Sequence, residues 1–297
     1  MDARKNNAGT RILVTGATGN TGRPITRALA ALGFSVRAAT PKGTDPRIDL
    51  EGAAHVRFDW KDASTHAEAL KDIDRMYLLA PGLADDPATL MIPFLERAFE
   101  GGVRRVVMLS SSAVPEGSPG LGSVHRFLRE QAPEWAVLQP SWFMQNFVNA
   151  RHHHGGSLRR NGRMLTSTGG GRVGFVDAAD IAAVAVRALA DEASHDRAHV
   201  ITGPEALSYD AIARALSEAL GRPVQHIDAS PEEALRDMME AGIPEPYARL
   251  LLDLEGRIRR GEEDRVTDTV ERVTGRAPRS FSDFVRAEAA QGVNPAV

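Results

Sequence analysis

The sequence predicts an α/β fold in which a doubly wound parallel sheet is joined to a smaller, mainly helical C-terminal lobe. Three observations support this prediction. Short apolar segments alternate with helical segments in the first half of the chain, a glycine turn follows the first apolar segment, and glycine-rich and then helical sequence replaces the alternation after Phe147. Parallel strands need crossover helices and are buried on both faces, so the pattern favours a parallel sheet.

The individual elements follow from apolar runs and from residues that end helices. A strand at 12–14 enters the glycine turn, and a helix from about Arg23 to Leu32 ends at Gly33. Further strands are expected at 34–40, 55–60, 75–81, 104–112, 135–141 and 198–203. Helices are expected at 88–102, 177–191, 208–221 and 230–242, and 109–130 ends as an amphipathic helix. Residues 149–174 are expected to form a loop or small hairpin.

These elements predict two parts. Residues 8–150 form a dinucleotide-binding core, to which 173–203 return, and residues 151–172 and 204–297 form a substrate lobe.

The composition narrows the classes of function. The 297 residues are 42% hydrophobic and 25% charged, with a formal net charge of −3, which offers no electrostatic footprint for nucleic acid or an anionic membrane. The absence of cysteine excludes disulfides, thiolate zinc sites, iron–sulfur clusters and a cysteine nucleophile. No secretory signal and no apolar run of the ~18 residues needed for a membrane span is seen. We expect a cytoplasmic monomer or homodimer that acts on a small molecule.

The glycine turn predicts a dinucleotide site. Gly16, Gly19 and Gly22 form G-x-x-G-x-x-G between a strand and a helix. In a Rossmann-type fold the first glycine permits the tight turn, the second lets backbone approach a pyrophosphate, and the third allows close packing of helix and strand. The helix N-terminus then attracts the phosphates.

The end of the second strand favours NADP(H) over NAD(H). NAD sites usually place an acid there to bind the ribose 2′-hydroxyl. Here Thr40 occupies the approximate position, Arg37 and Lys42 lie nearby, and the first acid is Asp45. The alternative is that Arg37 and Lys42 are solvated surface charges.

Four segments resemble the NmrA-like branch of the atypical short-chain dehydrogenases, and within it bacterial relatives of the festuclavine and agroclavine reductases of ergot alkaloid biosynthesis. They are "VTGATGNTG", "VRFDW" at 56–60, "LQPSWFMQNF" at 138–147, and "GFVDAADIAAVAVRAL" followed by "VITGPEALSYDAIARALSEALGRPV". The resemblance implies an NAD(P)H-dependent reductase of an iminium ion, a quinone or a conjugated double bond, in secondary metabolism. Two alternatives are a non-catalytic NADP-binding redox sensor, as some NmrA-like regulators are, and a cofactor-retaining cyclase or isomerase.

The resemblance also implies site residues. Those expected to bind the cofactor, besides the glycines, Thr40 and Lys42, are Thr18, Asn20, Thr21, Asp59, Trp60, Leu79, Ala80, Pro81, Ser110, Pro140 and Ser141. Those expected to line a substrate pocket are Trp142, Phe143, Met144 and Phe147, for which ordinary packing is the alternative.

The usual proton donor of short-chain dehydrogenases is missing. The tyrosines are Tyr77, Tyr209 and Tyr247, none followed four residues later by lysine, and no lysine occurs after Lys71. Ser111 and His125 remain as catalytic candidates, with Arg129 four residues from His125 on one helical face. The alternative places His125 on a solvated face. Hydride transfer to an iminium carbon needs no acid, so simple ketone reduction is disfavoured.

No metal site is expected. The run His152 to His154 could suggest one, but adjacent histidines point in different directions and no carboxylate is suitably spaced in the sequence. A pocket-lining role for one of these histidines is the preferred interpretation.

Overall fold

The computed structural model describes residues 7, 9–43, 52–82, 84 and 86–290. The chain divides into two compact units, the first made of residues 1–140 and 181–200 and the second of 141–180 and 201–297. Residues 141–150, assigned from the sequence to the nucleotide-binding core, cluster with the second unit.

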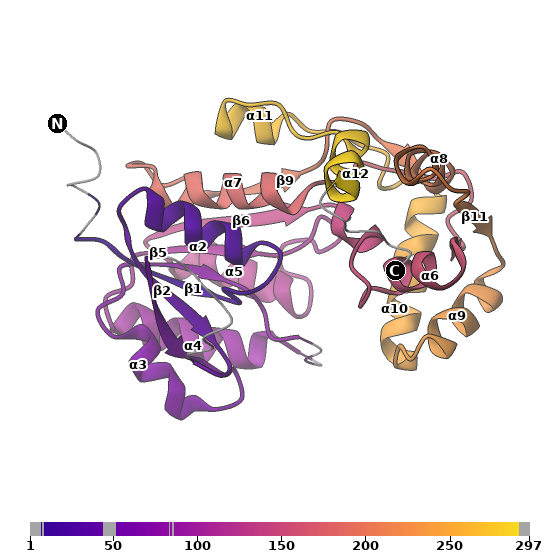
Figure 1. Ribbon diagram of the computed structural model, residues 1–297. Helices are drawn as coiled ribbons and strands as arrows, with labels where there is room; N and C mark the ends of the chain where they lie inside the picture. Colours follow the sequence, from indigo (N-terminus) through magenta and orange to yellow (C-terminus); the bar gives the residue numbers. More distant parts are fainter. Residues whose placement is uncertain (1–6, 8, 44–51, 83, 85, 291–297) are drawn as a thin grey trace. The chain divides into compact units, whose positions relative to one another are not determined.

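A seven-stranded sheet of order β3-β2-β1-β4-β5-β6-β9 forms the centre of the first unit (Figure 1). Its strands are β1 (Arg11–Thr15), β2 (Ser35–Thr40), β3 (Ala53–Arg57), β4 (Arg75–Leu78), β5 (Arg105–Leu109), β6 (Glu134–Pro140) and β9 (Arg197–Ile201). The pairings from β3 through β6 are parallel, and Val14 of β1 lies opposite Ala38 of β2 and Tyr77 of β4. This order confirms the predicted doubly wound sheet and places its topological switch point between β1 and β4, where open α/β sheets bind ligands.

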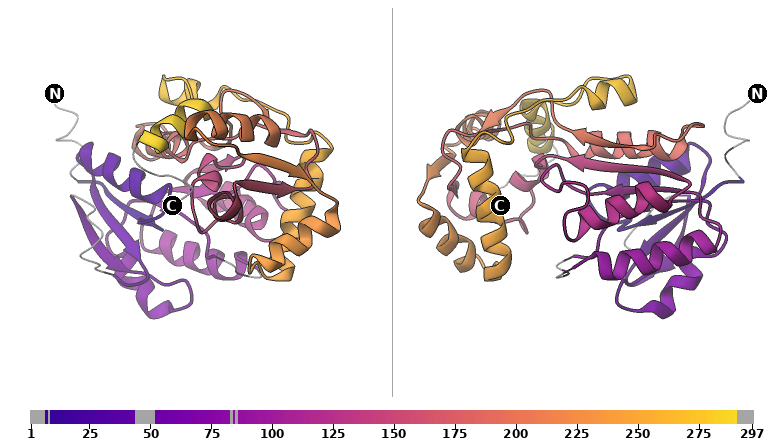
Figure 2. Two further views of the ribbon diagram at one scale, coloured as in Figure 1. Left: turned by 45° about the vertical axis from the view of Figure 1, so that its right-hand side comes forward. Right: turned by 180° about the vertical axis from the view of Figure 1, so that it is seen from behind.

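Helices cover both faces of this sheet (Figure 2). They are α2 (Gly22–Ala31), η1 (Ala63–Thr65), α3 (His66–Leu70), α4 (Ala88–Glu100), α5 (Leu121–Gln131) and α7 (Ala178–Ala190). Helix α2 matches the predicted helix and ends before Gly33, whose φ of 87° is readily adopted only by glycine. Because both faces are covered, Ile12, Leu13 and Val14 of β1 are completely buried, as their continuous apolar sequence predicts.

The buried side chain of Arg105 in β5 hydrogen-bonds to the backbone at the end of α7. The side chain of Arg105, only 1% exposed, forms an ion pair from Nε to Glu134 Oε2 at 2.6 Å. Its two terminal nitrogens donate to the carbonyl oxygens of Asp191 at 2.6 Å and Glu192 at 3.1 Å. The guanidinium therefore satisfies carbonyl groups left free where α7 ends.

The second unit has its own hydrophobic core. Its helices are η2 (Met144–Phe147), α6 (His153–Asn161), α8 (Tyr209–Leu220), α9 (Pro231–Glu240), α10 (Glu245–Arg259), α11 (Thr269–Thr274) and α12 (Phe281–Ala290). Strands β8 (Arg172–Val173) and β10 (Leu207–Ser208) pair antiparallel, while β7 (Arg163–Thr166) and β11 (Gln225–Asp228) pair in parallel. A capping box of Ser230 and Glu233 is present at the start of α9, where a helix was expected from residue 230. In the part of the chain that the structure describes, no helix combines the length and apolar character required to cross a bilayer.

Helix α6 is an element that the sequence analysis missed, since a loop or hairpin was expected over 149–174. Two glycines within it argue against a helix on propensity alone. The structure explains one of them: a Cβ on Gly155 would lie 2.2 Å from the carbonyl oxygen of Asn149, so close packing requires glycine there. The His152 side chain caps the start of the helix, and Gly162, with φ of 70°, ends it.

Candidate cofactor-binding site

The glycine turn between β1 and α2 is built for close approach of backbone to a ligand. Gly16 has φ of 61°, and a Cβ there would lie 2.3 Å from Leu79 Cδ2. A Cβ on Gly22 would lie 2.1 Å from the carbonyl oxygen of Gly16, so packing within the protein requires both glycines. Gly19 differs, because its Cβ would meet only the Gly16 oxygen, at 3.3 Å. Gly19 is therefore less crowded by the protein than Gly16 or Gly22, as expected for a glycine that must admit a pyrophosphate.

The polar residues of the turn have different surroundings. Thr18 and Asn20 are exposed, whereas Thr21 is buried and its hydroxyl lies 2.8 Å from the hydroxyl of Tyr77. The Thr21 hydroxyl thus hydrogen-bonds within the protein. A phosphate could therefore contact Thr21 only through its backbone N–H. Thr21 stays a predicted cofactor residue through its backbone only.

A cavity of about 260 Å³ lies at the carboxyl ends of the first four strands. It is lined by Thr15, Gly16, Ala39, Pro41, Phe58, Asp59, Trp60, Lys61, Leu79, Ala80, Pro81 and Gly82. Sequence reasoning singled out half of these positions and missed Thr15, Ala39, Pro41, Phe58, Lys61 and Gly82. The available signal was position, since each missed residue is adjacent in the sequence to a residue that was singled out. The cavity is apolar with few polar groups, which suits a planar base and its ribose.

Of the two basic residues expected near the end of β2, Arg37 is directed elsewhere and Lys42 is exposed. Arg37 points to the end of α3, where its Nη1 donates to the carbonyl oxygens of Glu68 at 2.9 Å and Lys71 at 2.7 Å. Its expected role near the 2′-position of the ribose is therefore wrong, because the guanidinium is held by those carbonyls. Lys42 is exposed, and the Thr40 hydroxyl donates to the Gly43 carbonyl oxygen at 2.7 Å.

A second arginine, Arg57, lies close to the end of β2. Arg57 ends β3 directly opposite Thr40 in the parallel register, and its side chain is 60% exposed while it pairs with Asp62 at 3.1 Å. Lys42 and Arg57 thus lie at the ends of neighbouring strands, and Lys61 lines the cavity. Asp45 lies outside the described residues.

Serines at the end of β5 offer polar groups to a ligand. The Ser110 hydroxyl is buried and has no hydrogen-bond partner among the described residues. Buried polar groups are nearly always paired, so this hydroxyl at a carboxyl strand end indicates a missing ligand. The Ser111 hydroxyl accepts a hydrogen bond from the N–H of Ala113 at 3.2 Å, and the Pro140 carbonyl accepts one from the N–H of Ser112 at 2.9 Å.

His125 is buried, which corrects the alternative of a solvated face. It is 3% exposed, and its ring packs 5.7 Å from the Trp135 ring. Trp135 is the second residue of β6, so this contact is near the end of the strand opposite to the ligand-binding edge. Glu116, which sequence spacing did not suggest, approaches to 3.8 Å. Burial lowers the pKa of His125, so the imidazole is neutral at neutral pH and is placed as a packing residue.

The tyrosines do not replace the missing acid. Tyr77 and Tyr209 are completely buried, and burial raises the pKa of each phenol. Tyr247 is 42% exposed on α10 of the second unit.

The residues that follow β6 fall into two groups. Met144 and Phe147 are at most 1% exposed and lie in the core of the second unit with Phe175 and Phe281, so packing is their role and the predicted substrate contact is corrected. The Ser141 hydroxyl is also buried and donates to the Gly174 carbonyl oxygen. Trp142 and Phe143 remain partly exposed.

The described residues therefore fit a dinucleotide. A glycine turn at a helix N-terminus offers space for a pyrophosphate, an apolar cavity accepts a base, and an unpartnered hydroxyl lies further along the same strand edge.

Comparison with known proteins shows which family the chain resembles. The chain is 46% identical over 279 residues to the uncharacterized oxidoreductase YesF of Bacillus subtilis, covering 94% of this chain and 95% of that protein. It is 33% identical over 285 residues to agroclavine dehydrogenase of Claviceps fusiformis, covering 92% and 96%. The structure of the triphenylmethane reductase of Citrobacter sp. complexed with NADP(H) shares the fold, with a TM-score of 0.78, 21% identity, and coverage of 93% and 99%.

The family predicted from the sequence is thereby confirmed. Residues 16–192, which begin at the first glycine of the turn, match the NAD(P)H-binding family. The chain belongs to this NAD(P)H-binding family of reductases.

Proposed function

We propose that this protein uses NADPH, in preference to NADH, to deliver hydride to a small, electron-poor acceptor such as an iminium ion, a quinone or a conjugated double bond. The observation that carries the proposal is a cofactor site in which none of the described residues is positioned as a proton donor. No Tyr-x-x-x-Lys pair occurs in the chain, and His125 packs against Trp135.

The preference for NADPH is supported by charge. Lys42 and Arg57 stand where the 2′-phosphate of NADPH would meet the ends of β2 and β3, and Thr40 replaces the acid typical of NAD sites. Arginine can bind a phosphate through two parallel hydrogen bonds, while lysine adds a point charge. Asp62 forms an ion pair with Arg57 and so reduces the attraction of Arg57 for a phosphate. Asp62 is not at position 40, where an NAD site would have its acid.

The chemistry of the acceptor follows from the missing acid. NADPH supplies hydride at its nicotinamide carbon when bound. Residues of the glycine turn would hold the pyrophosphate, the cavity beside Trp60 would hold the adenine end, and Ser110 would hold a polar group further along the edge. Transfer of hydride to an iminium carbon gives a neutral amine, and reduction of a quinone or enone takes its proton from water. A ketone without such activation would need the acid that this site does not position.

The named relatives support this substrate class. Agroclavine dehydrogenase, 33% identical to this chain, is named for a redox reaction of a small molecule. Trp142 and Phe143, both partly exposed, are the residues we assign to contact an acceptor of that kind.

The test is steady-state oxidation of NADPH against matched acceptors. Cyclic iminium ions, quinones and enones form the panel, and simple ketones of similar size are the control. We expect turnover with at least one activated acceptor and none above background with the ketones. Ketone turnover equal to that of the best activated acceptor would overturn the proposal. Equal affinity for NADP⁺ and NADPH together with no turnover on any acceptor would support a sensor instead.

A further inference from the structure

The second unit contains a buried cluster of two histidines and a carboxylate. His153 and His154 belong to α6, and Glu255 belongs to α10. One possible ligand atom from each of the three residues lies within 4.8 Å of the other two. His154 is 2% exposed and Glu255 is 1% exposed. The fold thus supplies the carboxylate that the sequence around the histidine run lacks.

The cluster has polar atoms without partners. Nε2 of His153, Nε2 of His154 and the hydroxyl of Tyr209 are all buried and make no hydrogen bond within the described part of the chain. The Tyr209 ring packs against His154 with centroids 5.4 Å apart. A buried polar group without a hydrogen-bond partner is unfavourable, so the two unpartnered histidine nitrogens beside Glu255 indicate a ligand that pairs with them.

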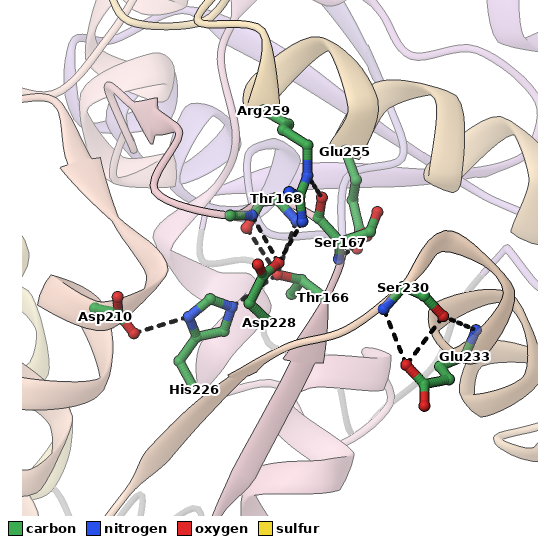
Figure 3. A network of polar contacts seen from close by, with 11 residues as sticks. Thr166, Ser167, Thr168, Asp210, His226, Asp228, Ser230, Glu233, Glu255 and Arg259 are labelled. Carbon is green, nitrogen blue, oxygen red and sulfur yellow. Dashed lines mark hydrogen bonds and ion pairs between the residues drawn. The ribbon is translucent and has the colours of Figure 1, made fainter.

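The carboxylate is held in a fixed orientation. Oε2 of Glu255 accepts hydrogen bonds from the backbone N–H of Ser167 at 2.7 Å and from its hydroxyl at 2.9 Å (Figure 3). Figure 3 also shows that Ser167 belongs to a polar network with Arg259 and Asp228. Carboxylates that bind metal ions are commonly oriented by such outer hydrogen bonds. This arrangement leaves Oε1 as the oxygen able to face an ion.

We propose that His153, His154 and Glu255 form a binding site for a divalent cation of the zinc class. Two imidazole nitrogens and one carboxylate oxygen suit Zn²⁺ or Co²⁺, whereas Mg²⁺ and Ca²⁺ prefer oxygen ligands alone. Water takes the fourth position. The ligand atoms of a tetrahedral zinc ion lie roughly 3.3 Å apart, so small side-chain movements complete the site. Its effect is to join α6 to α10.

The proposal reverses the expectation from the sequence for a definite reason. That expectation relied on adjacent histidines pointing in different directions and on the lack of a suitably spaced carboxylate. The ring centroids of His153 and His154 nevertheless lie 3.9 Å apart, and Glu255 comes from a distant helix that spacing alone does not bring near them. Neither the glycine turn nor the strand-end cavity includes these three residues, so the site is independent of the proposed reduction.

Calorimetric titration of chelator-treated protein without an affinity tag tests the site. ZnCl₂ is added at about pH 8, above the pKa of about 7 to which burial raises Glu255, so that the carboxylate is available. A parallel titration with CoCl₂ reports tetrahedral coordination through its visible absorption. We expect one ion per chain and a rise in Tm when Zn²⁺ is added.

Matched variants identify the ligands. Glu255→Gln keeps an acceptor for Ser167 and should weaken zinc binding at least ~10–100-fold, as should His154→Gln. Asp253→Asn, on the exposed side of the same helix, and His195→Ala, in another histidine cluster, should leave the affinity unchanged. Circular dichroism in the presence of chelator checks that each variant is folded, and His153→Asn provides a further ligand variant if one is not. No stoichiometric binding, or binding unchanged in the folded ligand variants, would overturn the proposal.

Discussion

The hydroxyl groups of Thr21 and Tyr77 lie 2.8 Å apart and tie the glycine turn to strand β4. Thr15 strengthens the same connection, because its hydroxyl donates to the Tyr77 carbonyl oxygen at 3.1 Å and accepts from the N–H of Leu79 at 2.7 Å. The turn is therefore fixed from both of its ends before any cofactor binds. This preorganisation reduces the entropy cost of ordering the turn around a pyrophosphate.

Substitutions of Gly19 and Gly22 should have different effects on cofactor binding and on stability. Gly19→Val should destabilise the protein less than Gly22→Ala, because its Cβ would meet only the Gly16 carbonyl oxygen at 3.3 Å, yet it should abolish binding of NADPH and NADH. Gly22→Ala should destabilise the protein by about 1–3 kcal/mol, because the new Cβ meets the Gly16 carbonyl. Urea unfolding and calorimetry measure the two effects. Full cofactor affinity in Gly19→Val would contradict this account of the turn.

The basic residues at the ends of β2 and β3 predict cofactor selectivity. NADPH should bind more tightly than NADH, and Lys42→Ala or Arg57→Ala should each lower affinity for NADPH about tenfold with little effect on NADH. Arg37→Ala is the control, since its guanidinium serves the end of α3; it should leave the NADPH to NADH ratio unchanged. An NADH preference in the parent protein would refute this prediction.

Removal of His125 should have little effect on catalysis. We expect His125→Ala to retain activity within about tenfold, a change in barrier of roughly 1.4 kcal/mol, because a hydride acceptor of the proposed class needs no acid. Loss of a general acid typically costs ~10²–10⁴-fold. Val124→Ala, which truncates a buried neighbour on α5, controls for packing. A loss above a hundredfold with cofactor affinity intact, and a missing limb in the pH profile, would instead make His125 the acid.

The same histidine predicts a pH dependence of stability. Burial lowers the pKa of His125 below its ordinary value of 6.5, so the unfolded chain takes up a proton that the folded protein excludes. Its contribution to stability is present above pH 6.5 and is lost as the pH falls. His125→Gln should therefore reduce the slope of unfolding free energy against pH, by at most ~1.4 kcal/mol per pH unit for one proton. Equal slopes for parent and variant between about pH 5 and 7 would show that the site does not titrate this way.

Arg105 predicts a large effect on stability. Arg105→Ala should lower the free energy of unfolding by about 3–5 kcal/mol, because it leaves Glu134 and the carbonyls at the end of α7 without their partner. Arg104→Ala, at the exposed neighbouring position, should change it by less than about 0.5 kcal/mol. Chemical denaturation compares the two, and similar small losses would show that the buried network contributes little.

Much of the fold was predictable because its signals are local. The buried strand Arg11–Thr15, the glycine turn and the end of α2 at Gly33 each follow from residues adjacent in the sequence. Helix α6 was not predictable in this way, because Gly155 serves close packing against Asn149 and lowers helix propensity at the same time. Tertiary packing decided the outcome there.

The site was predictable in position but only partly in detail. Residues at strand ends, such as Trp60 and Leu79, were located from the pattern of strands. The direction of the Arg37 side chain depends on where α3 ends, and the burial of His125 depends on α5 packing through Val124, His125 and Leu128. The nearness of Glu255 to the histidines depends on the packing of α6 and α10. Side-chain direction, burial and helix packing depend on tertiary structure, which sequence spacing alone does not determine.

The partners of Arg105 also constrain how the chain acquires its structure during synthesis. The carbonyl of Ala188, to which this guanidinium donates, follows it by 83 residues. At a translation rate of about 5–20 residues per second, roughly 4 to 17 s separate the appearance of the two groups. During that interval Glu134 can pair with this cation, but the carbonyl acceptors at the end of α7 have not yet been made. The amino-terminal strands therefore cannot reach their final state as an autonomous early domain on the ribosome, and chaperones would meet an incomplete sheet until α7 emerges.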